Sequence, residues 1–236
     1  MTDHAVLNAD DHSDLRIATQ RSAALGDAQM VCLLMPDEFR RAQDEYPILF
    51  RWNAARDRMD AYALLGFENG ENLFLKDGGW DAPYVPLAMD IAPLLIGRGP
   101  QGAQVHVDLA HPRIADAGDG VRLFDELGQA TPYLEQRVAR LQALDAGYQA
   151  TGPLVAALQR HQLIEPLTLE VTLADGSTNR LVGFHHIDED RLRALDAAAL
   201  GELHREGHLM ALFMAVASLG NVAKLIARKQ ATVRGG

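Results

Sequence analysis

The chain has 236 residues, 48% of them hydrophobic, which is enough to bury a sizeable core in one large or two small domains. Its 32 acidic residues outnumber its 22 basic ones, and the formal net charge of −10 argues against a nucleic-acid-binding protein because it repels phosphate backbones. The single cysteine, Cys32, excludes an internal disulfide bond and agrees with a reducing compartment.

The first segment, residues 1–28, is polar and has no hydrophobic periodicity, so we expect a flexible arm. It carries acids where a signal peptide has bases, which predicts a cytoplasmic protein. The ordered part is expected to be a single α+β domain over residues 29–236. We expect a β-rich half with mainly antiparallel strands over residues 29–130 and a helical half containing one β-hairpin over residues 131–236.

The β-rich half begins with apolar runs typical of buried strands. We predict strands over residues 30–35 and 48–52. Between them we predict a short helix over residues 36–45, because a proline and acids stand at its start. The runs at residues 62–67 and 71–76 are separated by Glu-Asn-Gly, which predicts a short hairpin between them.

Residues 80–100 contain four prolines, which exclude a continuous helix and predict an irregular segment that wraps the core. Trp80 and Tyr84 lie in this segment and are our candidate partner-binding residues, because amphipathic aromatics concentrate interface energy. The alternative is that both side chains cover the core. A strand is predicted next over residues 105–109, followed by a loop and a turn with a short strand.

The helical half begins at Thr131, which precedes a proline and predicts a helix over residues 132–145. Thr151 and Pro153 predict the start of a second helix in the same way. Residues 167–187 then alternate apolar and polar positions on either side of a short polar loop, which is the strongest hairpin signal in the chain.

The stretch LVGFHHIDEDRLRAL, from residue 181, raises the question of a metal site. His185 and His186 are consecutive in the second strand of the hairpin, so their side chains should point to opposite faces and cannot easily chelate one ion. Asp188 is placed to cap a following helix, with Glu189 and Asp190 in its first turn. We therefore interpret the acids as a folding signal.

Asp196 predicts another helix start, and Gly207 predicts where that helix ends. The last helix begins near His208 and has an apolar run of 11 residues, too short for a bilayer that needs about 20. We expect it to be the buried core of its half, so that Phe213→Ala lowers the free energy of unfolding by about 3 to 5 kcal/mol. The alternative is that this helix docks into a partner's groove.

A second metal hypothesis rests on His106 and Asp108, which alternate along a strand like the first two ligands of a two-histidine, one-carboxylate iron site. The third ligand would be one of three downstream histidines: His161, His185 or His186. The alternative is a half-exposed strand whose polar face carries these two residues. We expect no metal or cofactor.

Several segments, in this order and spacing, are similar to the SapC family of bacterial proteins. The segments are EYPILF (45–50), GENLFL (70–75), WDAPYVP (80–86), LFDELGQ (123–129), LIEPL (163–167), GFHHIDEDRLRAL (183–195) and HLMALFMAVASLGNVAKL (208–225). The resemblance implies a soluble, cytoplasmic bacterial protein, often encoded near TonB-dependent receptors, flavin-dependent halogenase-like proteins and cupin-like oxygenases. It implies no particular reaction and no catalytic residues.

Two functions remain open. The first is a non-enzymatic accessory protein that engages a peptide or protein partner in a bacterial nutrient-uptake or protein-modification system. The second is an Fe(II)- and 2-oxoglutarate-dependent oxygenase that uses His106 and Asp108. The absence of a recognisable nucleophile and base favours the first. The oligomeric state is left open.

Overall fold

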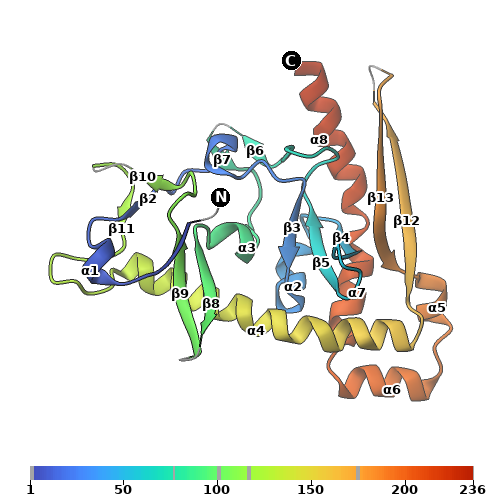
Figure 1. The fold of residues 1–236 in the computed structure, drawn as a ribbon. Helices are drawn as coiled ribbons and strands as arrows, with labels where there is room; N and C mark the ends of the chain where they lie inside the picture. The colour runs from blue at the N-terminus through green and yellow to red at the C-terminus, as the bar shows by residue number, and fades with distance from the viewer. Residues whose placement is uncertain (1–2, 77, 100–101, 116–117, 174–175, 236) are drawn as a thin grey trace. The chain divides into compact units, whose positions relative to one another are not determined.

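A computed structural model describes residues 3–235 except residues 77, 100–101, 116–117 and 174–175 (Figure 1). Its strands pair antiparallel, and its C-terminal half is helical with one long hairpin, so the predicted α+β class is confirmed. The chain forms two compact units. Unit 1 contains Met1–Ala28, Leu75–Asp81 and Leu87–Ala146, and unit 2 contains Gln29–Phe74, Ala82–Pro86 and Gly147–Gly236. This division differs from the expected single domain with halves meeting at residue 130.

Unit 1 is built from short strands and the first part of a long helix. Its strands are β1 (His4–Val6), β2 (Arg16–Ile17), β6 (Leu75–Lys76), β7 (Gly79–Trp80), β8 (Leu94–Gly99), β9 (Gly102–Asp108), β10 (Ile114–Ala115) and β11 (Val121–Arg122). They pair in the orders β1-β9-β8, β10-β2-β11 and β6-β7. Its helices are α1 (Ala9–His12), η1 (Ala23–Leu25), α3 (Leu87–Asp90) and the first half of α4 (Pro132–Arg160). The core residues are Ile17, Ile91, Leu94, Val107, Leu123, Phe124, Leu134 and Leu141.

The N-terminal segment is part of this core, so the expectation of an arm without regular structure is wrong for residues 3–28. Strand β1 pairs with β9, and Ile17 in β2 is only 1% exposed. Asp27 is also buried and accepts two hydrogen bonds of 2.6 Å from the Arg113 guanidinium. Elements of two to four residues are too short to produce a periodic pattern, so the sequence does not predict them.

From Leu87 onward, the proline-rich segment has more regular secondary structure than the sequence predicts. It forms α3 and then β8, which pairs along its length with β9. Within this pair the His106 ring lies directly over Gly97, where a Cβ atom would come within 2.1 Å of the imidazole Nε2. Glycine is therefore required at position 97 for the ring to lie there.

Unit 2 is centred on a five-stranded antiparallel sheet in the order β12-β13-β4-β5-β3 (Figure 1). The strands are β3 (Val31–Leu34), β4 (Ile48–Trp52), β5 (Met59–Leu64), β12 (Ile164–Thr172) and β13 (Thr178–Ile187). The first strands and the late hairpin match the predicted positions. The predicted hairpin of residues 62–67 with 71–76 is wrong, because β5 pairs with β3 and β4 instead.

The predicted second helix start at Thr151 is also wrong, since α4 runs unbroken from Pro132 to Arg160. The Thr151 hydroxyl donates a hydrogen bond of 3.1 Å to the Gly147 carbonyl one turn earlier, so it bonds within the helix instead of capping it. Gly147 lets the helix approach Met35 closely, because a Cβ there would lie 2.6 Å from the Met35 Cβ.

The remaining helices of unit 2 are η2 (Pro36–Glu38), α2 (Phe39–Ala42), α5 (Glu189–Arg193), α6 (Ala197–Arg205), α7 (Leu209–Ser218) and α8 (Asn221–Gly235). The two predicted caps are confirmed: Asp188 accepts from the Arg191 N–H at 3.0 Å and Asp196 from the Ala199 N–H at 2.8 Å. Gly207, with a φ of +80°, follows the end of α6, as predicted.

Helix α7 packs against α2, β4 and β13, but only with one side. Leu212, Ala215 and Ser218 are buried, whereas Phe213 is 52% exposed and Met210 is 57% exposed. The expectation that Phe213 belongs to the core is therefore wrong: a helix that is apolar all round gives no sign of which side is covered.

Among the described residues, one helical stretch, Leu209–Thr232, is long and apolar enough to cross a membrane by length and composition. Core helices of soluble proteins pass the same test. The stretch covers α7 and most of α8, and its buried Ser218 hydroxyl accepts a hydrogen bond of 2.9 Å from the Ile48 N–H in β4.

Candidate functional site

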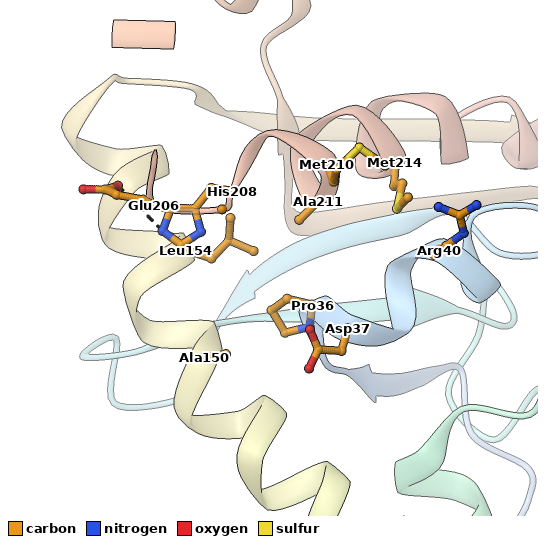
Figure 2. Close-up of a pocket in the computed structure, with 11 residues that line it drawn as sticks. Pro36, Asp37, Arg40, Ala150, Leu154, Glu206, His208, Met210, Ala211 and Met214 are labelled. Carbon is orange, nitrogen blue, oxygen red and sulfur yellow. Dashed lines mark ion pairs between the residues drawn. The ribbon is translucent and has the colours of Figure 1, made fainter. Parts of the chain in front are cut away.

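A groove beside helix α7 is the candidate site, and all of its lining residues belong to unit 2. Its volume is about 440 Å³. Figure 2 shows η2 and α2 on one side, α4 on another and the start of α7 on the third. The lining residues are Pro36, Asp37, Arg40, Ala150, Leu154, Glu206, Gly207, His208, Met210, Ala211 and Met214.

Helix α7 contributes an apolar stripe to this groove. Met210, Phe213, Met214 and Ala217 recur at the three- and four-residue spacing that places side chains on one helical face. Met210 and Met214 line the groove itself, and Phe213 extends the exposed apolar surface beside it. Leu154 of α4 is 2% exposed and closes the groove from the opposite side.

The polar side chains lie at the edges of the groove. Arg40 is exposed and has no ion-pair partner within the part of the chain that the structure describes. Figure 2 places it near the methionines, while Glu206 and His208 lie together at the other end. Glu206 also accepts hydrogen bonds of 2.7 and 2.9 Å from Arg160, which fixes its position.

His208 contributes an uncharged ring to the groove near neutral pH. Burial lowers the pKa of His208, and the Glu206 carboxylate 3.7 Å away offsets only part of this effect. The ring is therefore a hydrogen-bonding group at the groove's edge, and the fixed charges there are those of Asp37, Arg40 and Glu206.

Methionine side chains are flexible and polarizable, and they adapt to apolar partners of irregular shape. The groove can thus bind apolar side chains and orient them by charge at its two ends. Among the described residues no three His, Cys, Asp or Glu side chains are grouped to hold a metal ion.

The two predicted partner-binding aromatics, Trp80 and Tyr84, belong to different units. Trp80 is half-buried in β7 of unit 1. Tyr84 is half-buried in unit 2, where its hydroxyl donates a hydrogen bond of 2.5 Å to the buried Glu38 carboxylate and the Arg41 guanidinium lies 4.6 Å from its ring. Burial and then the Glu38 carboxylate raise the pKa of Tyr84. Its polar tip already has a partner within the fold.

The residues of the iron hypothesis are also divided. His106 and Asp108 lie in β9 of unit 1, and the three candidate third ligands, His161, His185 and His186, lie in unit 2. The Asp108 carboxylate accepts backbone hydrogen bonds from Asp3 at 3.3 Å and from Ala110 at 3.1 Å, so it organises the chain around β9.

The adjacent histidines of β13 diverge, as the strand geometry predicts. His186 lies 3.2 Å from Glu165, its cross-strand neighbour on β12. His185 instead lines a different hollow, beside β4.

The groove residues themselves were not predicted. The sequence predicts that the methionine-rich run of the last helix is core and that Pro36 begins a helix. The one available signal was that two methionines and a phenylalanine fall on a single face at positions 210, 213 and 214.

The fold is that of an α+β protein with antiparallel sheets and an open, methionine-lined groove. The chain belongs to the SapC family, whose family profile matches residues 7–225, nearly its whole length. No curated protein and no solved structure shows significant similarity to the chain.

Proposed function

We propose that the protein is a non-enzymatic binding protein that takes an apolar peptide segment of a partner protein into the groove beside α7. The supporting observation is the exposed stripe of Met210 and Phe213 next to a groove lined by Met214 and Leu154. Large apolar side chains exposed together mark interaction sites in soluble proteins.

The charges around the groove favour a particular kind of segment. Asp37 and Glu206 favour basic residues on the partner, and the unpaired Arg40 favours an acid near the methionine end. An amphipathic helix with apolar side chains at three- and four-residue spacing, flanked by bases, fits this pattern. An anionic membrane surface fits less well, since the chain carries a net charge of −10.

The family resemblance adds context to this proposal. It favours a bacterial, cytoplasmic accessory protein that acts in nutrient uptake or protein modification beside TonB-dependent receptors. The partner would then be a protein of that system, with no nucleic acid involved.

A peptide-display selection on the intact protein tests the proposal. Libraries would be selected on the wild-type chain and counter-selected on Met210→Glu, which places a charge in the groove. We expect enriched peptides with apolar anchors at three- and four-residue spacing flanked by bases. Their Kd, measured by fluorescence anisotropy, should rise at least tenfold in Met210→Glu because a buried, unpaired carboxylate is costly.

Val182→Glu is the matched control, since Val182 is 56% exposed on β13 and does not line this groove. It should bind the selected peptides as wild type does. Two results would overturn the proposal. One is a concentration-dependent dimer that Phe213→Glu abolishes, which would assign the stripe to a second copy. The other is binding to phosphatidylglycerol vesicles that the same variant abolishes, which would assign it to a membrane surface.

A further inference from the structure

A second hollow, of about 740 Å³, lies in unit 2 where strands β3, β4, β5 and β13 come together. Its volume is within the range of pockets that hold small molecules. Its lining differs in character from that of the methionine groove. The lining residues are Val31, Arg51, Trp52, Asn53, Ala54, Arg56, Tyr62, Gly183 and His185.

The lining carries two positive charges and no negative one, although the whole chain has a net charge of −10. Arg51 and Arg56 are exposed, and neither forms an ion pair with any residue that the structure describes. The Arg51 guanidinium lies 5.3 Å from the ring centroid of Phe184, a contact that leaves its N–H donors free.

Among the described residues neither arginine forms an ion pair with the acids that lie near it in the chain, Asp57 and Asp60, which bond to other side chains. The Asp60 carboxylate accepts a hydrogen bond of 2.6 Å from Arg58. Asp57 accepts one of 2.6 Å from the Asn53 side chain, whose oxygen in turn accepts from the Asp57 N–H at 3.2 Å. These bonds fix the loop that presents Arg56.

His185 lines the hollow from β13. Burial lowers the pKa of its ring, and a backbone hydrogen bond with Phe50 offsets part of this effect. The ring is therefore uncharged near neutral pH and leaves the two arginines as the charges of the lining.

Two aromatic side chains complete the lining. Trp52 and Tyr62 are both half-buried. An aromatic face beside a free guanidinium is suited to a ligand that combines a flat apolar group with an anionic group.

We propose that this hollow binds a small organic oxyanion, a carboxylate or phosphate attached to a flat apolar group. Arg51 and Arg56 hold the anionic group, and Trp52 and Tyr62 contact the flat part. Nucleic acids are excluded as ligands by the acidity of the chain as a whole. The site is independent of the groove beside α7, with which it shares no lining residue.

Two-dimensional 1H–15N NMR of the full chain tests the proposal with 2-naphthoate, 2-naphthyl phosphate and the neutral 2-naphthamide. We expect either anion to shift the Trp52 indole signal and the backbone signals around Arg56 and His185 in a saturable way. Whichever anion binds more tightly identifies the oxyanion. The Kd should rise at least tenfold in Arg56→Gln, because this change removes one charge-assisted bidentate contact. It should rise further in the double variant Arg51→Gln, Arg56→Gln.

Arg205→Gln is the matched control, since Arg205 is an exposed arginine of unit 2 that does not line the hollow. It should leave the Kd unchanged, and thermal melts should show that every variant folds. The proposal is overturned if neither anion gives saturable shifts, if the amide binds as tightly as the anions, or if the folded double variant binds them as wild type does.

Discussion

The Ser218 hydroxyl in helix α7 accepts a hydrogen bond of 2.9 Å from the backbone N–H of Ile48 in strand β4, and it donates one of 2.6 Å to the Ala215 carbonyl. Both Ser218 and Ile48 are buried, at 0% and 1% exposed. The Ser218 hydroxyl thus takes the place of a strand carbonyl as acceptor for the Ile48 N–H, and the bond fixes α7 to the sheet.

Ser218→Ala should lower the free energy of unfolding by about 1 to 3 kcal/mol, because it leaves the Ile48 N–H buried without a partner. Urea denaturation of the two proteins measures this difference. Ser13→Ala, at an exposed position, is the control and should stay within about 0.5 kcal/mol of wild type. An equal effect of both changes would mean that the Ser218 bond contributes nothing specific.

Helix α7 offers a direct comparison between its covered and open sides. Phe213 is 52% exposed and Leu212 beside it is 0% exposed. Leu212→Ala should therefore cost about 2 to 5 kcal/mol, the range for a buried leucine, whereas Phe213→Ala should cost less than about 1 kcal/mol. Denaturation curves of both variants decide this, and a larger loss for Phe213 would contradict the exposure of the stripe.

This helix also shows where prediction from sequence reaches its limit. Strands with alternating or continuous apolar residues, such as β4 and β13, and caps such as Asp188 were predicted because their signals are local. Which side of an apolar helix is covered depends on residues far away in the chain, here in α2, β4 and β13. The groove could not be predicted for the same reason.

Two other errors have equally specific causes. Thr151 and Pro153 resemble a helix start, but the threonine hydroxyl bonds to the carbonyl of Gly147 and the helix continues. The N-terminal strands β1 and β2 gain their partners from residues about 100 positions later in the chain. A segment of two or three residues cannot carry such information in its own sequence.

Unit 1 contains a buried ionic network whose removal has a predictable effect. Arg113, 3% exposed, makes two hydrogen bonds of 2.6 Å to Asp27, which is 1% exposed. Arg113→Leu removes the closest cation from the Asp27 carboxylate, which keeps the Ser22 N–H at 2.8 Å and the Arg21 guanidinium at 3.3 Å. The free energy of unfolding should fall by about 3 to 5 kcal/mol, as expected when one partner of a buried pair is removed.

The control for this prediction is the ion pair of Arg98 with Asp145 in the same unit. Arg98 is 58% exposed, so Arg98→Leu should change the free energy of unfolding by less than about 1 kcal/mol. Urea denaturation measures the free energy of unfolding of both variants. A similar loss in Arg98→Leu and in Arg113→Leu would show that burial does not determine how much the Asp27 pair contributes to stability.

The last prediction concerns the dependence of stability on pH. Nδ1 of His111 accepts a hydrogen bond of 3.1 Å from the Arg113 N–H, which requires this nitrogen to be unprotonated. Burial, and then the Arg113 guanidinium, lower the pKa of His111 below its usual 6.5. The unfolded chain thus binds a proton that the folded protein does not, in the pH range between the folded pKa and 6.5.

Because unfolding takes up this proton, the free energy of unfolding should fall as the pH drops below about 6.5. His111→Asn keeps an oxygen that can accept from the Arg113 N–H but does not titrate. Urea denaturation between pH 7 and pH 5 should therefore show a shallower decline in this variant. The decline should not vanish, since burial also lowers the pKa values of His185 and His208. An unchanged slope in His111→Asn would mean that the His111 ring protonates equally well in the folded protein.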